Sequence, residues 1–330
     1  MMRPRWTGAA LLLATGVAAC GGARAITRAH EIVDDTVRVV TPTGTLVGSR
    51  MRPRDVARPP VVLIHPGSGP TSRDGNPPGA LVGNDHLRQL AESLAAHGIA
   101  SVRIDKRGVG ASRAALTMPP DSVTLGHFVR DARAWLEQLR ADTAWGRVYA
   151  LGHSEGGLIA SIAARGLALD GVILVAAPGR RMGEIMRAQF ADPERLPRAF
   201  YPLADSALHA LETGAPMPAM RGPLRLLFSP VNERFLRSLL AEVPQARVAV
   251  LAMPVLVVQG TTDLQVTPRD AELLATAARR GTLAMLPGIN HVMRRASGGV
   301  IAQQQSYVMP VPAVAREVVA PIVRFVGRGE

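Results

Sequence analysis

The sequence predicts an α/β protein built on a doubly wound, mostly parallel sheet. Three short apolar runs, at residues 61–64, 172–175 and 255–258, are typical of strands covered on both faces. Between such runs, apolar residues recur at helical spacing. Alternation of strand and helix over this length indicates βαβ units and parallel pairing. The alternation stops between residues 179 and 247, which indicates an inserted helical region.

The individual elements follow from local signals along the chain. Residues 37–51 alternate apolar and polar side chains around Gly44, which predicts an antiparallel hairpin. A helix is expected to begin at Asn84 or Asp85 and to stop at Gly98. The other expected elements, besides the three apolar runs, are strands at 99–104, 147–151 and 283–286 and helices at 125–139, 157–164, 270–278 and 311–326. Pro321 is expected to kink the last helix or to divide it.

Composition supports a large folded core and argues against a nucleic-acid partner. The 330 residues are 47% hydrophobic with a mean hydropathy of +0.14, which excludes disorder for the bulk of the chain. The net charge is +12, but Lys106 is the only lysine and the arginines are scattered. Nucleic-acid binding calls for a clustered basic stripe with aromatic side chains, and aromatic residues make up only 4%. The charge fits arginine-rich codon usage, with some attraction to an anionic membrane surface.

Residues 1–19 predict an export signal. Arg3 and Arg5 form a basic start, and the apolar stretch at residues 8–17 is too short to span a bilayer. Two alanines and then Cys20, the only cysteine of the chain, follow. This arrangement resembles a bacterial lipoprotein signal, in which the cysteine becomes the acylated first residue of the mature protein. The resemblance implies a lipid anchor in the cell envelope, which several acyl chains would make stable.

An ordinary signal, cleaved for instance after residues 23–25, is the alternative, and it would give a secreted soluble protein. With a single cysteine, no disulfide framework is expected in either case. The chain is then expected to divide into a tether at residues 20–35, a first core part at 36–178, a helical cap at 179–247 and a second core part at 248–330.

The segment Gly152-His153-Ser154-Glu155-Gly156 fits the pattern G-x-S-x-G of a nucleophile elbow. An expected strand precedes it and an expected helix follows it. Such a sharp turn forces its central residue into a strained backbone conformation, and the two glycines leave room for the crossing. A bare motif occurs by chance in glycine-rich chains, but this context favours Ser154 as a nucleophile.

A serine hydroxyl needs a base to take its proton and a third group to orient that base. On a doubly wound sheet these groups come from the carboxyl ends of later strands. The loop after the 172–175 strand holds no acid, whereas Asp263 stands at the mouth of the 255–258 strand. Asp270 is better explained as a helix-start residue. Asp263 is therefore the predicted acid.

His291, directly after the last expected strand, is the predicted base. It completes the chain order Ser, Asp, His that is typical of this architecture. His209 follows the nucleophile as well, but its surroundings indicate an ordinary helix histidine. The histidines upstream are weaker candidates: His86 and His97 flank a helix, His127 points away from its helix's apolar stripe, and His153 is the variable position of the elbow.

The oxyanion of an acyl-transfer reaction needs preorganised N–H donors. The backbone amide of Glu155, next to the nucleophile, is one predicted donor. The other is expected in the glycine-rich loop after residue 64, where Ser68 is preferred and Gly69 is the reserve. This loop lacks the P-loop pattern for phosphate, and no spacing of His, Cys or carboxylates indicates a metal. Neither a metal nor a cofactor is expected.

Together these segments resemble the α/β-hydrolase fold over about residues 36–328. The similarity is to bacterial carboxylesterases, often grouped with serine-aminopeptidase-like hydrolases, and its segments are Gly67-Ser68-Gly69-Pro70, Arg73-Asp74, Asp105-Lys106-Arg107-Gly108, Gly152-His153-Ser154-Glu155-Gly156, Gly260-Thr261-Thr262-Asp263 and Asn290-His291. The resemblance implies a helical cap inserted after the sixth main strand. One departure is Pro66, where relatives usually carry glycine. Arg73, Asp74, Asp105 and Arg107 are interpreted as salt-bridge braces of the loops.

The expected function is a serine hydrolase that cleaves carboxylic esters of small to medium acyl groups through an acyl-enzyme. A peptidase acting on short peptides is the first alternative, because a cap carboxylate could meet an α-ammonium group. The cap offers Glu184, Asp192, Glu194, Asp205 and Glu212. A non-catalytic envelope lipoprotein that uses the fold for binding is the second alternative.

Overall fold

The structure, a computed structural model, describes residues 30–328. The predicted export signal, Cys20 and most of the predicted tether lie outside these residues. The prediction of a tether as far as residue 35 is wrong at its end, because strand β1 (Ile32–Thr41) already begins there. It pairs antiparallel with β2 (Gly44–Pro53), and Arg50 on β2 donates to Asp35 across the pair. The observed hairpin therefore extends beyond the predicted residues 37–51 at its open end.

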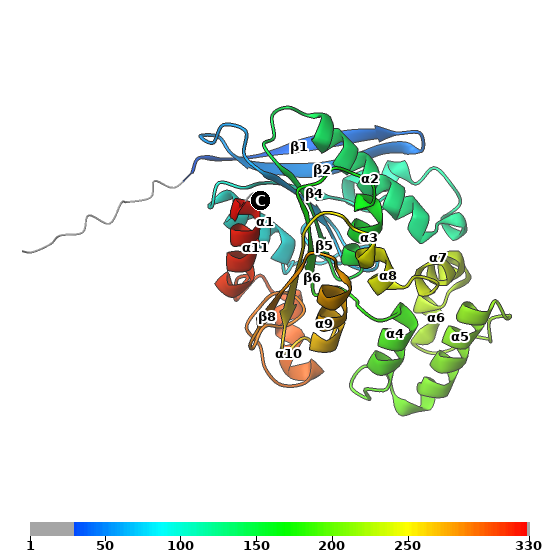
Figure 1. The fold of residues 1–330 in the computed structure, drawn as a ribbon. Helices are drawn as coiled ribbons and strands as arrows, with labels where there is room; N and C mark the ends of the chain where they lie inside the picture. The colour runs from blue at the N-terminus through cyan, green and yellow to red at the C-terminus, as the bar shows by residue number, and fades with distance from the viewer. Residues whose placement is uncertain (1–29, 329–330) are drawn as a thin grey trace, which may run out of the picture.

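A single sheet of eight strands forms the centre of the molecule (Figure 1). Its order is β1-β2-β4-β3-β5-β6-β7-β8, and β2 pairs antiparallel with β4 (Ala100–Ile104). All neighbours from β4 to β8 are parallel. The remaining strands are β3 (Val61–His65), β5 (Val148–His153), β6 (Gly171–Val175), β7 (Val255–Gly260) and β8 (Gly281–Leu286). The predicted doubly wound, mostly parallel sheet is confirmed.

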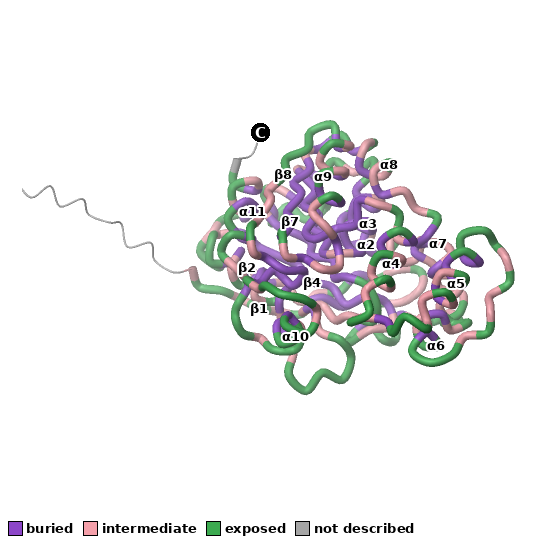
Figure 2. The backbone as a smooth tube through the Cα atoms, turned by 90° about the horizontal axis from the view of Figure 1, so that it is seen from below, coloured by how far each residue is buried: buried purple, intermediate pink, exposed green. Residues whose placement is uncertain are grey.

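Helices cover both faces of the sheet, which explains the continuously apolar strands. One face packs against α1 (His86–Ala95) and α11 (Arg316–Arg328). The other face packs against α2 (Leu125–Ala141), α3 (Glu155–Ala164), α8 (Pro244–Ala249) and α9 (Pro268–Ala277). The side chains of β3 alternate between the two faces. Val62 and Ile64 pack in the hydrophobic cluster on the α1 side, and Val61 and Leu63 pack in the cluster on the other side. Figure 2 shows buried backbone concentrated in these layers.

The helices between β6 and β7 form a cap with its own apolar cluster. They are α4 (Met182–Phe190), a short 3₁₀ turn at Arg198–Phe200, α5 (Tyr201–Thr213), α6 (Leu224–Leu227) and α7 (Pro230–Leu240). Leu208, Phe228 and Leu236 lie at the centre of the cluster. In Figure 1 these four helices stand together beside the sheet, whereas α8 returns to it and packs on α3 and α9. The predicted cap after β6 is confirmed.

The segment that leads into the cap is held to the start of α9 by Asp270, which is completely buried. Its carboxylate accepts hydrogen bonds from the Arg180 side chain and from the backbone N–H groups of Gly179 and Arg180. It also makes a capping box with Thr267 at the start of α9. The interpretation of Asp270 as a helix-start residue is confirmed.

The C-terminal region differs from the prediction. The expected helix at 311–326 begins instead at Arg316, and Pro321 lies inside α11 without dividing it. Prolines 310 and 312 account for the late start, because proline lacks the N–H that a helix interior requires. An unpredicted helix, α10 (Val300–Val308), precedes them. Within residues 30–328, no helix combines the length and the apolar character needed to cross a membrane.

Candidate active site

Ser154 occupies a strained turn between β5 and α3. Its φ of 55° and ψ of −130° lie where few residues with a side chain are found, so the surroundings must impose this conformation. A Cβ atom added to Gly152 would lie 2.1 Å from the Gly156 carbonyl oxygen, and one added to Gly156 would lie 2.5 Å from the Pro66 carbonyl oxygen. Both glycines are therefore required. Ser154 is the only residue from Val148 to Ser161 that is not buried, so its side chain is presented to the site.

Asp263 and His291 form a buried hydrogen-bonded pair at the ends of β7 and β8. His291 Nδ1 donates to Asp263 Oδ2 over 2.8 Å, and each residue is only 4% exposed. The other carboxylate oxygen, Oδ1, accepts the backbone N–H groups of Gln265 at 2.8 Å and Val266 at 3.0 Å. With Nδ1–H committed to Asp263, Nε2 of His291 is left as a proton acceptor.

The electrostatics keep the Asp263 carboxylate charged. Burial by itself would raise the pKa of this carboxyl, but the interaction with His291 and the two backbone N–H donors hold the pKa below its usual value. A charged acid can both orient the imidazole and stabilise it when it takes a proton.

His153 joins this pair to the nucleophile elbow. Its Nε2–H donates to the backbone carbonyl of His291 over 2.8 Å, and the two ring centroids are 4.9 Å apart. The loop of His291 is thereby held against the residue that precedes Ser154. The structure brings all three predicted residues to one edge of the sheet, after β5, β7 and β8 respectively. Their catalytic roles stay predictions.

Two histidines that the sequence analysis set aside belong to this site. His86 is buried at the start of α1, its Nδ1–H donates to Asn84 Oδ1 at 2.6 Å, and its ring lies 4.8 Å from that of His153. His86, His153 and His291 thus form a row of imidazoles. Burial, aided by the neighbouring His291, lowers the pKa of His153 to about 3 and lowers that of His86 well below its usual value. No local signal identifies this row, because its three members come from three segments far apart in sequence.

Replacing one buried imidazole should change the pH dependence of stability. The unfolded chain takes up a proton on His153 near pH 6.5, but the folded protein does so only near pH 3, so stability falls as the pH drops through this window. His153→Gln can keep the donor to His291 and removes the titration. Between pH 7 and pH 5 the wild type should lose about 2 kcal/mol more unfolding free energy than the variant. Urea titrations at both values measure this difference.

An exposed cap histidine, His209, provides the control as His209→Gln, because an effect common to both variants would report loss of an imidazole and not its burial. Parallel pH profiles for wild type and His153→Gln would show that the His153 ring is not held neutral.

The predicted oxyanion loop lies against the elbow. Gly67 is buried, and a Cβ there would come within 3.1 Å of Ser154 Cβ, whereas Ser68 is exposed. Within residues 30–328, neither the Ser68 nor the Glu155 backbone N–H donates to another protein atom. Glu155 is the first residue of α3, where helix N–H groups lack intrahelical partners. Both predicted donors are therefore available to a ligand.

Salt bridges brace the loops, as predicted for Arg73, Asp74, Asp105 and Arg107. Arg73 pairs with Asp105 at 2.6 Å, which also accepts the Arg73 backbone N–H at 2.9 Å. Arg107 pairs with Asp131 at 2.5 Å in a buried, bidentate ion pair. Asp74 pairs with Arg103. Asp131 and Arg103 are partners that the sequence analysis did not name, because they come from α2 and the middle of β4.

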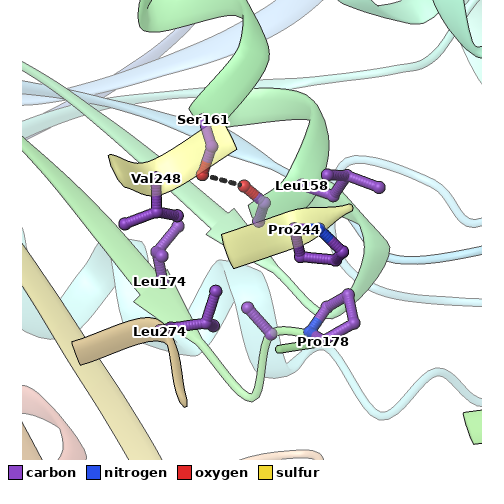
Figure 3. Close-up of a pocket in the computed structure, with 9 residues that line it drawn as sticks. Leu158, Ser161, Leu174, Pro178, Pro244, Val248 and Leu274 are labelled. Carbon is purple, nitrogen blue, oxygen red and sulfur yellow. Dashed lines mark hydrogen bonds between the residues drawn. The ribbon is translucent and has the colours of Figure 1, made fainter. Parts of the chain in front are cut away.

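Two cavities lie beside α3 and beside the loop after Asp263, and neither is lined by Ser154, Asp263 or His291. Figure 3 shows the first, an apolar gap between α3, β6, α8 and α9, where Ser161 donates to the Gly157 carbonyl at 2.8 Å and no water-sized space remains. The second has a volume of about 290 Å³ and opens between the cap, the loop after Asp263 and α10. Its lining residues are Glu194, Arg195, Leu264, Gln265, Val300, Ile301, Gln303, Gln304 and Tyr307. This second cavity can admit part of a small molecule, and the first cannot.

Solved structures with the same fold identify the architecture as that of the α/β hydrolases. Est1E from Butyrivibrio proteoclasticus is 15% identical, with a TM-score of 0.55 over 89% of this chain and 99% of that one. The α/β hydrolase GrgF from Penicillium sp. sh18 is 18% identical, with a TM-score of 0.55 over 90% of this chain and 99% of that one. At these identities the likeness establishes the fold alone. The chain has the α/β-hydrolase fold.

Sequence comparisons add two findings. The family model described as serine aminopeptidase, S33 matches residues 84–208. Esterase EstD from Thermotoga maritima is 27% identical over 244 residues, which cover 73% of this chain and 56% of that protein. The chain therefore aligns with little more than half the length of this curated relative.

Proposed function

We propose that the protein is a serine hydrolase that cleaves carboxylic esters of small to medium acyl groups. The observation that carries the proposal is the buried Asp263–His291 pair, which His153 joins to the elbow that carries the strained, partly exposed Ser154. The name of the relative EstD and the fold support the same chemistry.

In this reaction His291 Nε2 takes the proton of the Ser154 hydroxyl as its oxygen attacks the ester carbonyl carbon. The negative charge that forms on the carbonyl oxygen is met by the backbone N–H groups of Ser68 and Glu155. Collapse of this intermediate breaks the bond to the alcohol, which leaves with the proton from His291. Water, deprotonated by His291, then attacks the acyl-enzyme, and the bond to Ser154 Oγ breaks as His291 returns the proton to this oxygen, which releases the acid and restores the enzyme.

The alternative of a peptidase has its own support, since the matching family model is described as a serine aminopeptidase. An aminopeptidase needs a carboxylate for the α-ammonium group of its substrate, but most cap candidates are already engaged. Asp205 and Glu212 both pair with Arg187, and Glu194 accepts the Val300 backbone N–H. Asp192 pairs with Arg195 at 3.6 Å. This arrangement favours the ester reaction.

The test compares p-nitrophenyl acetate and butyrate with aminoacyl p-nitroanilides on one preparation of the protein. We expect kcat/KM to be higher for the esters. Turnover of the anilides at higher kcat/KM would replace the proposal by the peptidase. No turnover of either class and no labelling by a fluorophosphonate would favour a binding protein.

We also propose that the protein is lipid-anchored in the cell envelope through Cys20. The short apolar stretch ending at this sole cysteine supports the proposal. Cys20→Ala should move the protein from the membrane fraction to the soluble one when expressed in a bacterium, as judged by fractionation and immunoblotting. A variant that stays wholly with membranes would contradict the anchor.

A further inference from the structure

We propose that Lys106 is the positioning residue of the oxyanion site. Its ammonium group sets the plane of the peptide between Gly67 and Ser68, and this aims the Ser68 N–H at the substrate oxygen. The inference rests on the proposed function and goes beyond it by assigning the residue that orients one of its two donors.

Lys106 donates hydrogen bonds to the oxyanion loop on both sides of Ser68. The lysine is only 4% exposed, and its Nζ donates to the carbonyl oxygen of Gly67 at 2.6 Å and to that of Gly69. These two carbonyls flank the predicted donor in sequence. Hydrogen bonds from a charged donor are about twice as strong as neutral ones, so the ammonium is the strongest contact available to these carbonyls.

The direction of the Ser68 N–H follows from the geometry of a trans peptide. The Gly67 carbonyl and the Ser68 N–H belong to one planar unit and point in opposite directions. An ammonium bound to the carbonyl therefore turns the N–H away from Lys106 and also polarises it into a better donor. The next unit is held differently, because the Ser68 carbonyl accepts the Thr71 hydroxyl at 2.7 Å. The carbonyl of Gly69 precedes Pro70, which has no N–H, so only the Ser68 donor is set by the ammonium.

The second predicted donor is linked to the same network. Glu155, whose backbone N–H is that donor, is only 2% exposed. Burial lowers the pKa of Lys106 and raises that of Glu155, and the attraction between the two groups opposes both shifts. A buried ammonium and a buried carboxyl thus support the two sides of the oxyanion site.

The contacts at this position suit a lysine, although the chain otherwise uses arginine. Of 38 lysine and arginine residues, Lys106 is the only lysine. An ammonium is a compact point charge with three donors, whereas a guanidinium presents its donors in a rigid planar fork that matches carboxylates and phosphates. The ring of Phe128, with its centroid 5.8 Å from Nζ, adds a cation–π contact to the ammonium. These contacts suit the compact charge of a lysine, which this sequence uses nowhere else.

Lys106→Met tests the inference, because methionine keeps the length of the side chain and removes the charge and the donors. We expect kcat/KM on p-nitrophenyl acetate to fall about 10²-fold, with KM nearly unchanged. The affinity of a trifluoromethyl ketone, which forms a tetrahedral adduct with the serine, should fall by the same factor. A merely structural lysine would not change inhibitor affinity and turnover in proportion.

Two further variants separate positioning from stability. Lys106→Gln restores a neutral donor to the carbonyls and should fall between wild type and Lys106→Met in both measurements. Arg107→Lys weakens the neighbouring buried salt bridge without touching the loop, and it should lower Tm while keeping kcat/KM near the wild-type value. Wild-type kcat/KM and inhibitor affinity in folded Lys106→Met would overturn the inference.

A measurement on the wild type covers the case in which both Lys106 variants fail to fold. Because the chain has one lysine, [ε-¹³C]lysine gives a single side-chain NMR signal. This signal should shift when the trifluoromethyl ketone binds, and Ser154→Ala should abolish the shift. An unchanged signal at saturating inhibitor would overturn the inference. A wild type that is inert toward esters and fluorophosphonate would instead remove the proposed function, and this inference with it.

Discussion

Ser154→Ala should lower kcat on p-nitrophenyl acetate by about 10⁴- to 10⁶-fold, to the level left by binding and the oxyanion donors. The hydroxyl is the only group at the elbow that can form the acyl-enzyme. The residual rate and labelling by a fluorophosphonate probe measure the effect. Labelling should disappear completely, while circular dichroism and Tm show that the fold persists.

Ser161→Ala is the matched control, because this serine lies in α3, the helix that follows Ser154, but is buried and donates only to the Gly157 carbonyl. It should keep full labelling and nearly full kcat. If Ser154→Ala retained wild-type turnover, the assignment of the nucleophile would be wrong. If Ser161→Ala lost labelling, the probe would be reporting helix integrity and not the nucleophile.

Asp263→Asn should lower kcat by about 10⁴-fold with little change in KM. The asparagine oxygen can keep the N–H groups of Gln265 and Val266, which turns its NH₂ toward His291 Nδ1. Nδ1 must then accept, so the proton moves to Nε2 and the ring can no longer take the proton of Ser154. Steady-state kinetics on the same ester measure the loss.

The same variant has a predicted stability signature. Because the folded pKa of Asp263 is depressed, its charge contributes stability above the unfolded pKa of about 3.9, and this contribution is lost as the pH falls through the folded value. Asp263→Asn should therefore be less stable than wild type at pH 7, and the gap should close in acid. Asp270→Asn, which removes a buried carboxylate outside the site, serves as the control and should keep nearly full kcat. Equal losses of kcat in the two variants would show that general destabilisation explains both.

The features that the sequence predicted correctly depend on short-range patterns. The strands at β3, β6 and β7 are continuous apolar runs because both faces of the sheet are covered. Ser154 is identified by a strand, a turn and a helix in direct succession. Asp263 and His291 were selected because parallel strands place their carboxyl ends at one edge, so the order of strands alone brings the residues together.

What the sequence did not predict depends on contacts between distant segments. His86 joins the row of imidazoles only because the start of α1 brings its ring against that of His153 at the end of β5, and no periodicity encodes that contact. Helix α10 contains Gln303, Gln304 and Gln305, which give no clear apolar stripe, and one of its partners, Asn84, lies more than two hundred residues upstream. Lys106 was noted as the only lysine and as part of the segment Asp105-Lys106-Arg107-Gly108, but without a role of its own, because its contacts depend on how the loop after β3 folds against it.

The burial of the only lysine also determines how the protein can be handled in the laboratory. Amine-reactive dyes and coupling resins would find the α-amino group but no exposed lysine on the native surface, since every other basic side chain that carries a fixed charge is an arginine. Modification of Lys106 by such a reagent would therefore require the loop to open. The rate of that reaction, followed by mass spectrometry, would therefore report the rate at which the loop opens.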